Sequence, residues 1–146
     1  MRSEPIRILL VEDNVADVYL FRKALLGANL DFELTIFEDG AEALAFVRGE
    51  GKYVDNPIPH LAVLDLNLPK NDGLQVLQAM RQSERYAKVP VVVTSSAATM
   101  QPLPEQLRIA RYIPKPADLD EFLQIGPGLK KIVYESTTAE NIDSEA

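Results

Sequence analysis

Three carboxylates directly follow short apolar runs in this sequence of 146 residues. Glu12 and Asp13 come after residues 8–11, and Asp65 comes after residues 61–64. Carboxylates that share one small site repel each other unless a cation lies among them. The ligands are oxygens, and the chain has no Cys and a single His, so this set favours Mg²⁺ over zinc. For Glu12 or Asp13 alone, the alternative is that it only caps the following helix.

Two further groups with matching chemistry follow later apolar runs. Three hydroxyl-bearing residues, 94–96, come after residues 91–93, and Lys115 comes shortly after residues 111–113. A cation, an ammonium group and a hydroxyl each stabilise negative charge on a phosphoryl group, and a carboxylate can be the nucleophile that accepts it. The five groups together predict phosphoryl chemistry, although each alone has an ordinary structural explanation.

The runs that carry these groups are expected to be β-strands. Three of them have almost no polar residues, as is typical of strands buried on both faces: residues 6–11, 61–64 and 91–93. Residues 32–36 alternate between apolar and polar, and residues 111–113 precede Pro114, which cannot donate to a neighbouring strand. These last two runs are interpreted as edge strands.

Helical patterns of apolar residues separate the five strands. This alternation predicts an α/β fold: a doubly wound, five-stranded parallel sheet in the order 2-1-3-4-5, with helices on both faces. In such a sheet, ligands bind beyond the carboxyl ends of the strands, where the winding direction switches. That point lies between the first and third strands, which end at Glu12-Asp13 and Asp65.

Composition excludes several other classes of protein. The 22 acidic and 15 basic residues give a net charge of −7, which argues against nucleic acid as a partner. The longest apolar run near the start is too short for a signal peptide or a membrane span, so we expect a cytoplasmic location and no membrane partner. One domain over residues 5–134 is expected, followed by an acidic tail, residues 135–146, without regular structure.

Four segments make the sequence similar to the receiver domains of two-component response regulators. They read ILLVEDN, VLDLNLPKNDG, VVVTSSA and YIPKP, and the resemblance spans residues 6–133. It implies that Asp65 is the phosphoacceptor and that Lys115 is the lysine of the phosphorylation pocket. It also implies an acid pocket of Glu12 and Asp13, and Mg²⁺ ligands from Asp13, Asp65 and the backbone carbonyl of Asn67.

The same resemblance implies a conformational switch. The family pattern places the switch hydroxyl five residues after a proline. Counted from Pro90, this position is Ser95, and Thr94 is the alternative. Tyr112 matches the aromatic residue whose ring turns inward when that hydroxyl moves toward the phosphoryl group. The family also has a cis peptide bond where this chain has Lys115-Pro116.

Two segments depart from the family pattern. Pro102 and Pro104 lie where the family has its fourth helix, so that helix must be shortened or displaced. Gly126, Pro127 and Gly128 lie inside the last helical pattern, whose apolar residues keep their phase on either side. One kinked helix is therefore favoured over two separate helices.

The function expected from this resemblance is that of a single-domain response regulator, which is not an enzyme toward other substrates. A partner histidine kinase would phosphorylate Asp65. The long connection over residues 49–59 resembles stand-alone receivers found beside bacterial phytochrome-type kinases, which often dimerise. His60, directly after residue 59, belongs to the same connection and is interpreted as a plain loop residue rather than a phosphodonor. Phosphorylation would change association with a second copy, the kinase or a phosphotransfer protein, and these alternatives stay open.

Two other functions compete with this one. A Mg²⁺-dependent phosphohydrolase with an aspartyl nucleophile would usually have a second acid two residues after it, where this chain has Asn67, and would carry a cap domain. A receiver-like binding module that is never phosphorylated would be expected to have lost Asp65 or Lys115. Both residues are present.

Overall fold

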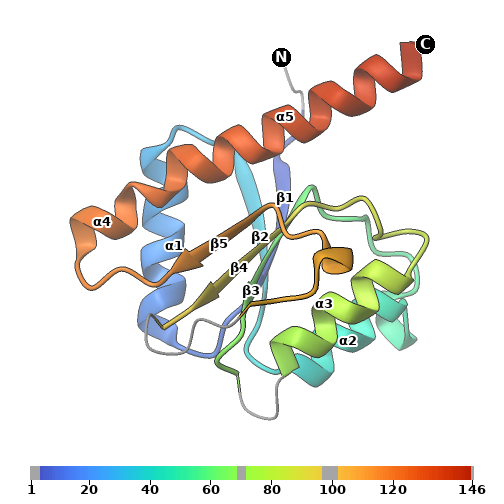
Figure 1. The fold of residues 1–146 in the computed structure, drawn as a ribbon, viewed down its shortest axis with the longest axis horizontal. Coiled ribbons are helices and arrows are strands. Elements are labelled where there is room, and N and C mark those ends of the chain that lie inside the picture. The colour runs from blue at the N-terminus through green and yellow to red at the C-terminus, as the bar shows by residue number, and fades with distance from the viewer. Residues whose placement is uncertain (1–3, 69–71, 97–101, 146) are drawn as a thin grey trace.

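A computed structural model describes residues 4–68, 72–96 and 102–145, with the backbone alone described for residues 137–145. Its strands form one parallel sheet in the order β2-β1-β3-β4-β5 (Figure 1). The strands are β1 (Ile6–Val11), β2 (Phe32–Phe37), β3 (Leu61–Asp65), β4 (Val91–Ser95) and β5 (Arg111–Pro114). The predicted fold class and strand order are confirmed.

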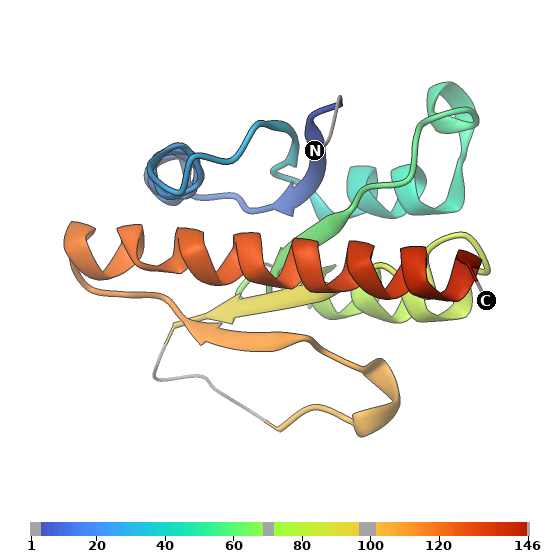
Figure 2. The same ribbon diagram turned by 90° about the horizontal axis from the view of Figure 1, so that it is seen from above.

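Helices cover both faces of the sheet (Figures 1 and 2). On one face lie α1 (Val15–Gly27), the short α4 (Leu119–Leu123) and α5 (Ile125–Glu145), and on the other lie α2 (Gly40–Arg48) and α3 (Asp72–Gln82). In β1, Ile8 and Leu10 pack toward α1 and α5, whereas Leu9 and Val11 pack toward α2 and α3. Because successive side chains of a strand point to opposite faces, both sets must be apolar.

The last helical region is two helices, which corrects the single kinked helix favoured by the sequence. α4 ends at Leu123 and α5 begins at Ile125. The ring of Pro127 is incompatible with a helical carbonyl four residues earlier, at Leu123, and Pro127 has no N–H to donate. A Cβ at Gly126 would overlap the carbonyl oxygen of Ala24, so this glycine lets the start of α5 approach α1 closely.

The helix α5 continues to Glu145, where the sequence predicts a tail without regular structure. No Gly or Pro follows Gly128, and extending an existing helix adds one hydrogen bond for each residue fixed. Figure 1 shows the end of α5 projecting beyond the sheet. Although α5 has 21 residues, no helix in the described ranges has the length and apolar character needed to cross a membrane.

The connection from β4 to β5 departs from the family pattern, as the prolines predict. Between residues 102 and 110 its helical structure is one 3₁₀ turn, η4 (Glu105–Leu107), and residues 97–101 lie outside the described part. The guanidinium of Arg81 in α3 holds this segment against the loop before β4. It donates to backbone carbonyls at 2.6–3.2 Å, those of Leu107, Ala87, Val89 and Arg108.

Candidate functional site

The acidic residues after β1 are positioned by the sheet and by the start of α1. The backbone N–H of Glu12 donates to the carbonyl of Phe37 at 3.0 Å, which extends the pairing of β1 with β2 by one residue. Asn14 caps α1 by accepting a hydrogen bond from the N–H of Asp17. As a result the Glu12 side chain is buried, whereas Asp13 is exposed at the edge of the site.

Asp65 is the last residue of β3 and its side chain is only 2% exposed. Its Oδ1 accepts a hydrogen bond from the backbone N–H of Asn67 at 2.8 Å. The side-chain oxygen of Asn67 accepts from the N–H of Ser96 at 2.6 Å, which joins the loops after β3 and β4. Gly73 packs directly against the Asp65 carbonyl, where a Cβ would overlap the oxygen.

Lys115 follows β5 and bridges the carboxylates. Its backbone N–H donates to the Ser95 carbonyl at 2.8 Å, which continues the β4–β5 pairing. Its Nζ lies 2.6 Å from Glu12 Oε1, 3.0 Å from Asp17 Oδ2 and 3.1 Å from Asp65 Oδ2. Burial lowers the pKa of Lys115, but the hydrogen bonds to these acids outweigh it and raise the pKa above its ordinary value.

Two details at Lys115 differ from the expectations. The resemblance implies a cis bond between Lys115 and Pro116, whereas every described peptide bond is trans. Asp17 was not predicted to belong to this site. Its position in the first turn of α1, three residues after Asn14, was the available signal, because that turn lies beside the carboxyl edge of the sheet.

The three predicted acids form one group in the structure. Carboxylate oxygens of Glu12, Asp13 and Asp65 all lie within 4.8 Å of one another. Burial, followed by the neighbouring Asp65, raises the pKa of Glu12 well above its ordinary value of 4.5. The buried Glu12 Oε2 has no hydrogen-bond partner among the described residues. An all-oxygen group with an unpartnered carboxylate oxygen fits a hard divalent cation such as Mg²⁺.

The hydroxyl and the aromatic residue also lie side by side. Ser95 is the last residue of β4 and is buried, and its Oγ accepts a hydrogen bond from the Tyr112 hydroxyl at 3.1 Å. The same Oγ donates to the Ser96 carbonyl at 3.0 Å. Thr94 is buried one position earlier and pairs in register with Asp65. The contact with Tyr112 therefore involves Ser95, the first of the two hydroxyl candidates.

Comparison with known proteins places this arrangement in a family. Residues 8–125 match the family described as the response regulator receiver domain. The chain is 35% identical over 138 residues to response regulator Rcp1 of Synechocystis sp., covering 93% of this chain and 94% of that protein.

Two solved structures are also similar. The phosphorylated cyanobacterial phytochrome response regulator RcpA has a TM-score of 0.76 and 36% identity, over 90% of this chain and 95% of that one. The Mn²⁺-bound form of Rcp1 has a TM-score of 0.73 and 35% identity, over 86% and 92% of the two chains. The chain therefore belongs to the response regulator receiver domain family, whose members are signalling proteins rather than metabolic enzymes, and it is related to phytochrome response regulators.

Proposed function

We propose that this chain is a single-domain response regulator that accepts a phosphoryl group on Asp65 from a partner histidine kinase, in a Mg²⁺-dependent reaction. The observation that carries this proposal is the buried Asp65 carboxylate, with Lys115 Nζ 3.1 Å from one oxygen and two further acids beside it. A phytochrome-type kinase is the proposed donor, because the similar structure RcpA, which the chain covers to 95%, is a phytochrome response regulator by name. The proposed function does not require the chain to pass the phosphoryl group on to a further substrate.

In the proposed reaction an Asp65 oxygen attacks phosphorus. One oxygen–phosphorus bond forms, and the bond from phosphorus to the donor's histidine nitrogen breaks, so that the imidazole leaves with the electron pair. Lys115 donates to the phosphoryl oxygens as their charge develops, and Ser95, at the end of the strand next to β3, is the proposed second donor. Asp13, Asp65 and the backbone carbonyl of Asn67 would hold Mg²⁺. When bound, this ion would offset the negative charge of the phosphoryl oxygens.

Exposed apolar side chains beside the site support a protein as the donor. Val15 and Tyr19, at the start of α1, are 72% and 57% exposed, and Leu119, at the start of α4, is 51% exposed. Val15 follows Asp13 by two residues and Leu119 follows Lys115 by four, so both helices begin at the edge that contains the acids. A partner that brings a phosphohistidine to Asp65 would cover these side chains.

The output proposed for the phosphorylated form is altered association with another protein molecule. The hydrogen bond between Tyr112 and Ser95 provides a route for it, since a hydroxyl drawn toward the phosphoryl group changes its contact with the ring. A second copy of the chain, the kinase and a phosphotransfer protein are the proposed candidates. Location in the cytoplasm remains part of this proposal.

Mass spectrometry after incubation with Mg²⁺ and acetyl phosphate tests the function directly. We expect one added phosphoryl group that is labile in base and maps to the peptide containing Asp65. The Asp65→Asn variant is the control and should gain none. Equal labelling of this variant would exclude Asp65 as the acceptor. Turnover of unrelated phosphate esters would instead favour the phosphohydrolase, and a wild-type chain that is never labelled would favour the binding module.

Mg²⁺ is expected to stabilise the folded chain, because binding relieves repulsion among the acids. At a concentration one hundred times the Kd, the gain in free energy of unfolding should be about 2.7 kcal/mol. The Asp13→Asn variant should lose most of this gain. The control is Asp55→Asn, which replaces an exposed acid in the connection before β3 and should keep the gain. Urea unfolding with and without Mg²⁺ measures the difference. An equal gain in all three proteins would refute Asp13 as a ligand.

The Tyr112→Phe variant is expected to be labelled on Asp65 as the wild type is, but to associate less strongly once phosphorylated. The hydrogen bond couples the ring to the Ser95 hydroxyl, and a coupling of about 0.5–1.5 kcal/mol lost in the variant should lower the association constant by up to about tenfold. Tyr53→Phe is the matched control, since it loses a hydrogen bond to Glu42 away from the site. Analytical ultracentrifugation of the phosphorylated proteins measures association. Equal association of Tyr112→Phe and wild type would rule out this switch role.

A further inference from the structure

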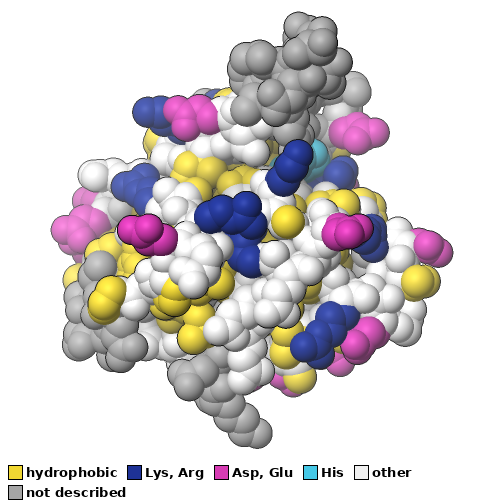
Figure 3. All heavy atoms as spheres, turned by 45° about the vertical axis from the view of Figure 1, so that its right-hand side comes forward, with side chains coloured by type: hydrophobic (Ala, Val, Ile, Leu, Met, Phe, Trp, Pro, Cys, Tyr) yellow, Lys and Arg dark blue, Asp and Glu magenta, His cyan; other side chains and the backbone are white. Residues whose placement is uncertain are grey.

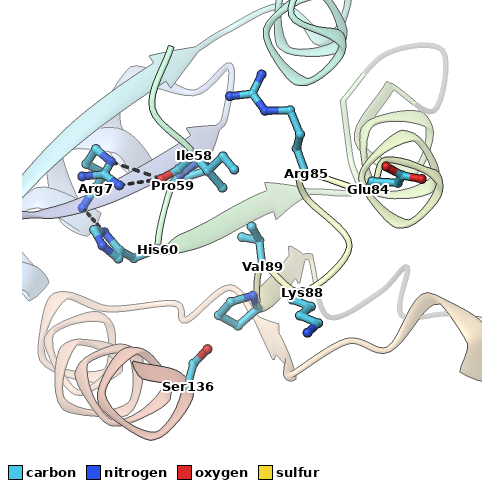
Figure 4. A pocket seen from close by; sticks show the side chains of 10 residues that line it. Arg7, Ile58, Pro59, His60, Glu84, Arg85, Lys88, Val89 and Ser136 are labelled. Atoms are coloured by element: carbon cyan, nitrogen blue, oxygen red, sulfur yellow. Dashed lines mark hydrogen bonds between the residues drawn. The ribbon is translucent and has the colours of Figure 1, made fainter. Parts of the chain in front are cut away.

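A cavity of about 330 Å³ lies at the edge of the sheet opposite to the acids, and the proposed function does not use it. Its lining includes four basic residues and a buried apolar pair, namely Arg7, His60, Arg85, Lys88, Pro59 and Val89 (Figure 4). Arg7 lies near the start of β1 and Glu12 directly after its end. Five residues of extended strand separate the two sites by roughly 16 Å.

Backbone carbonyls hold the two guanidinium groups in place. Arg7 donates from Nε and Nη2 to the carbonyl of Ile58 at 3.1 and 2.9 Å, and Arg85 donates to the carbonyl of Asn56 at 3.1 Å. A neutral acceptor fixes a guanidinium without cancelling its positive charge, and each guanidinium has five N–H donors. Arg7 also lies 3.9 Å from Glu4, but the Glu4 side chain is 78% exposed, so this ion pair is weak.

Lys88 completes a positively charged rim with the two arginines, and His60 lies within it. Figure 4 shows Arg7 and His60 on one side of the cavity and Lys88 across from them. His60 Nδ1 accepts the backbone N–H of Arg7 at 2.9 Å, so the neutral ring carries its proton on Nε2.

One acidic side chain accompanies this rim in the part of the cavity lining that the structure describes. Glu84 is the acidic residue of the lining, and within the described ranges neither Arg85 nor Lys88 forms an ion pair. In Figure 3 the histidine, in cyan, lies beside dark blue Lys and Arg side chains. Among the described lining residues, Arg7, Arg85 and Lys88 outnumber Glu84, so the charge of this lining is positive in a chain with a net charge of −7, and a cleft focuses such a charge onto an entering anion.

The floor of the cavity is suited to an apolar group. Pro59 and Val89 are buried, and Ile58 and Pro90 are partly buried beside them. The volume is at the lower end of the range for small-molecule sites, which is about 300–1,000 Å³. A cavity with a cationic rim and an apolar floor matches a small molecule that has an anionic end and an apolar body.

We propose that this cavity binds a small organic phosphate. The phosphate would contact the rim formed by Arg7, Arg85 and Lys88, and the apolar body would pack on Pro59 and Val89. Guanidinium groups match the geometry of phosphate oxygens because they can donate two parallel hydrogen bonds. The site is separate from Asp65, at the opposite edge of the sheet.

A titration with phenyl phosphate in the absence of Mg²⁺ tests this site. We expect saturable changes in the NMR signals of the backbone amides of Arg7, His60 and Val89. The double variant Arg85→Gln/Lys88→Gln should bind at least about tenfold more weakly, because two charge-assisted contacts are lost. The control Arg22→Gln/Lys131→Gln removes the same charge from exposed positions on α1 and α5 and should bind as the wild type does.

Two comparisons decide the class of ligand. Inorganic phosphate has no apolar body and phenol has no phosphate, so each should bind more weakly than phenyl phosphate. Equal binding of inorganic phosphate would refute the role of the apolar floor. Shifts that do not saturate, or an equal loss of affinity in the two double variants, would show that the interaction follows net charge and would overturn the proposal.

Discussion

Replacing Lys115 with Gln is expected to slow phosphorylation of Asp65 by acetyl phosphate by about 10²–10³-fold, the usual cost of losing one donor to a developing oxyanion. Lys115 Nζ lies 3.1 Å from Asp65 and 2.6 Å from Glu12. The substitution removes the partly buried cation from this group and leaves the acids in place. The initial rate of phosphoryl incorporation at saturating Mg²⁺, followed by mass spectrometry, measures the effect.

The control for this result is Lys131→Gln, which removes the same charge from a side chain 75% exposed on α5. Its rate should equal that of the wild type. Circular dichroism should show that both variants are folded, so that a lower rate reports on chemistry. A Lys115→Gln rate within about threefold of the wild type would mean that Lys115 does not contact the phosphoryl group, and the mechanism proposed here would fail.

The second large effect is expected for Gly73→Ala, which should lower the free energy of unfolding by about 1–3 kcal/mol or more. Gly73 is buried in the first turn of α3, and a Cβ there would overlap the Asp65 carbonyl oxygen. The added methyl must push α3 away from β3 or displace the backbone that carries the phosphoacceptor. We therefore expect slower labelling of Asp65 together with the loss of stability. Urea unfolding and the labelling rate measure the two effects.

Gly27→Ala provides a matched comparison. Gly27 is the last residue of α1, and a Cβ at this position would have nothing within 4 Å. Because Ala favours helix by about 1 kcal/mol over Gly, this variant should be at least as stable as the wild type and labelled at the same rate. If both glycine variants lost the same stability, the close approach of Gly73 to Asp65 would not be the cause.

Local patterns in the sequence were sufficient to predict the sheet. A strand buried on both faces must be apolar at every position, and this requirement is visible at residues 6–11, 61–64 and 91–93 without any tertiary contact. The order of the strands followed from which runs were apolar throughout and which two had the marks of edge strands, the alternation of residues 32–36 and the proline after residues 111–113. The carboxyl ends of neighbouring parallel strands meet at one edge, so the proximity of Glu12, Asp13 and Asp65 could be predicted as well.

Features that depend on contacts between distant segments could not be predicted in this way. The family pattern favoured Ser95 but left Thr94 open, and the contact with Tyr112 depends on the register of β4 with β5, which pairs Val93 with Tyr112 and Ser95 with Pro114. Asp17 joins the site through the direction in which α1 leaves β1. The break between α4 and α5 at Gln124 depends on Pro127 and on the approach of Gly126 to Ala24.

The cavity with the cationic rim shows most clearly what the sequence does not predict and the tertiary structure decides. Arg7, His60 and Lys88 are far apart in the sequence, and nothing in their local spacing predicts a common site. They meet because β1, the connection before β3 and the loop before β4 all reach the same edge of the sheet. The sequence alone determined the strands, their order and the acids at their ends, since burial and helix signals are local. Tertiary structure decided which side chains touch, because such distances depend on register, helix direction and close packing between segments.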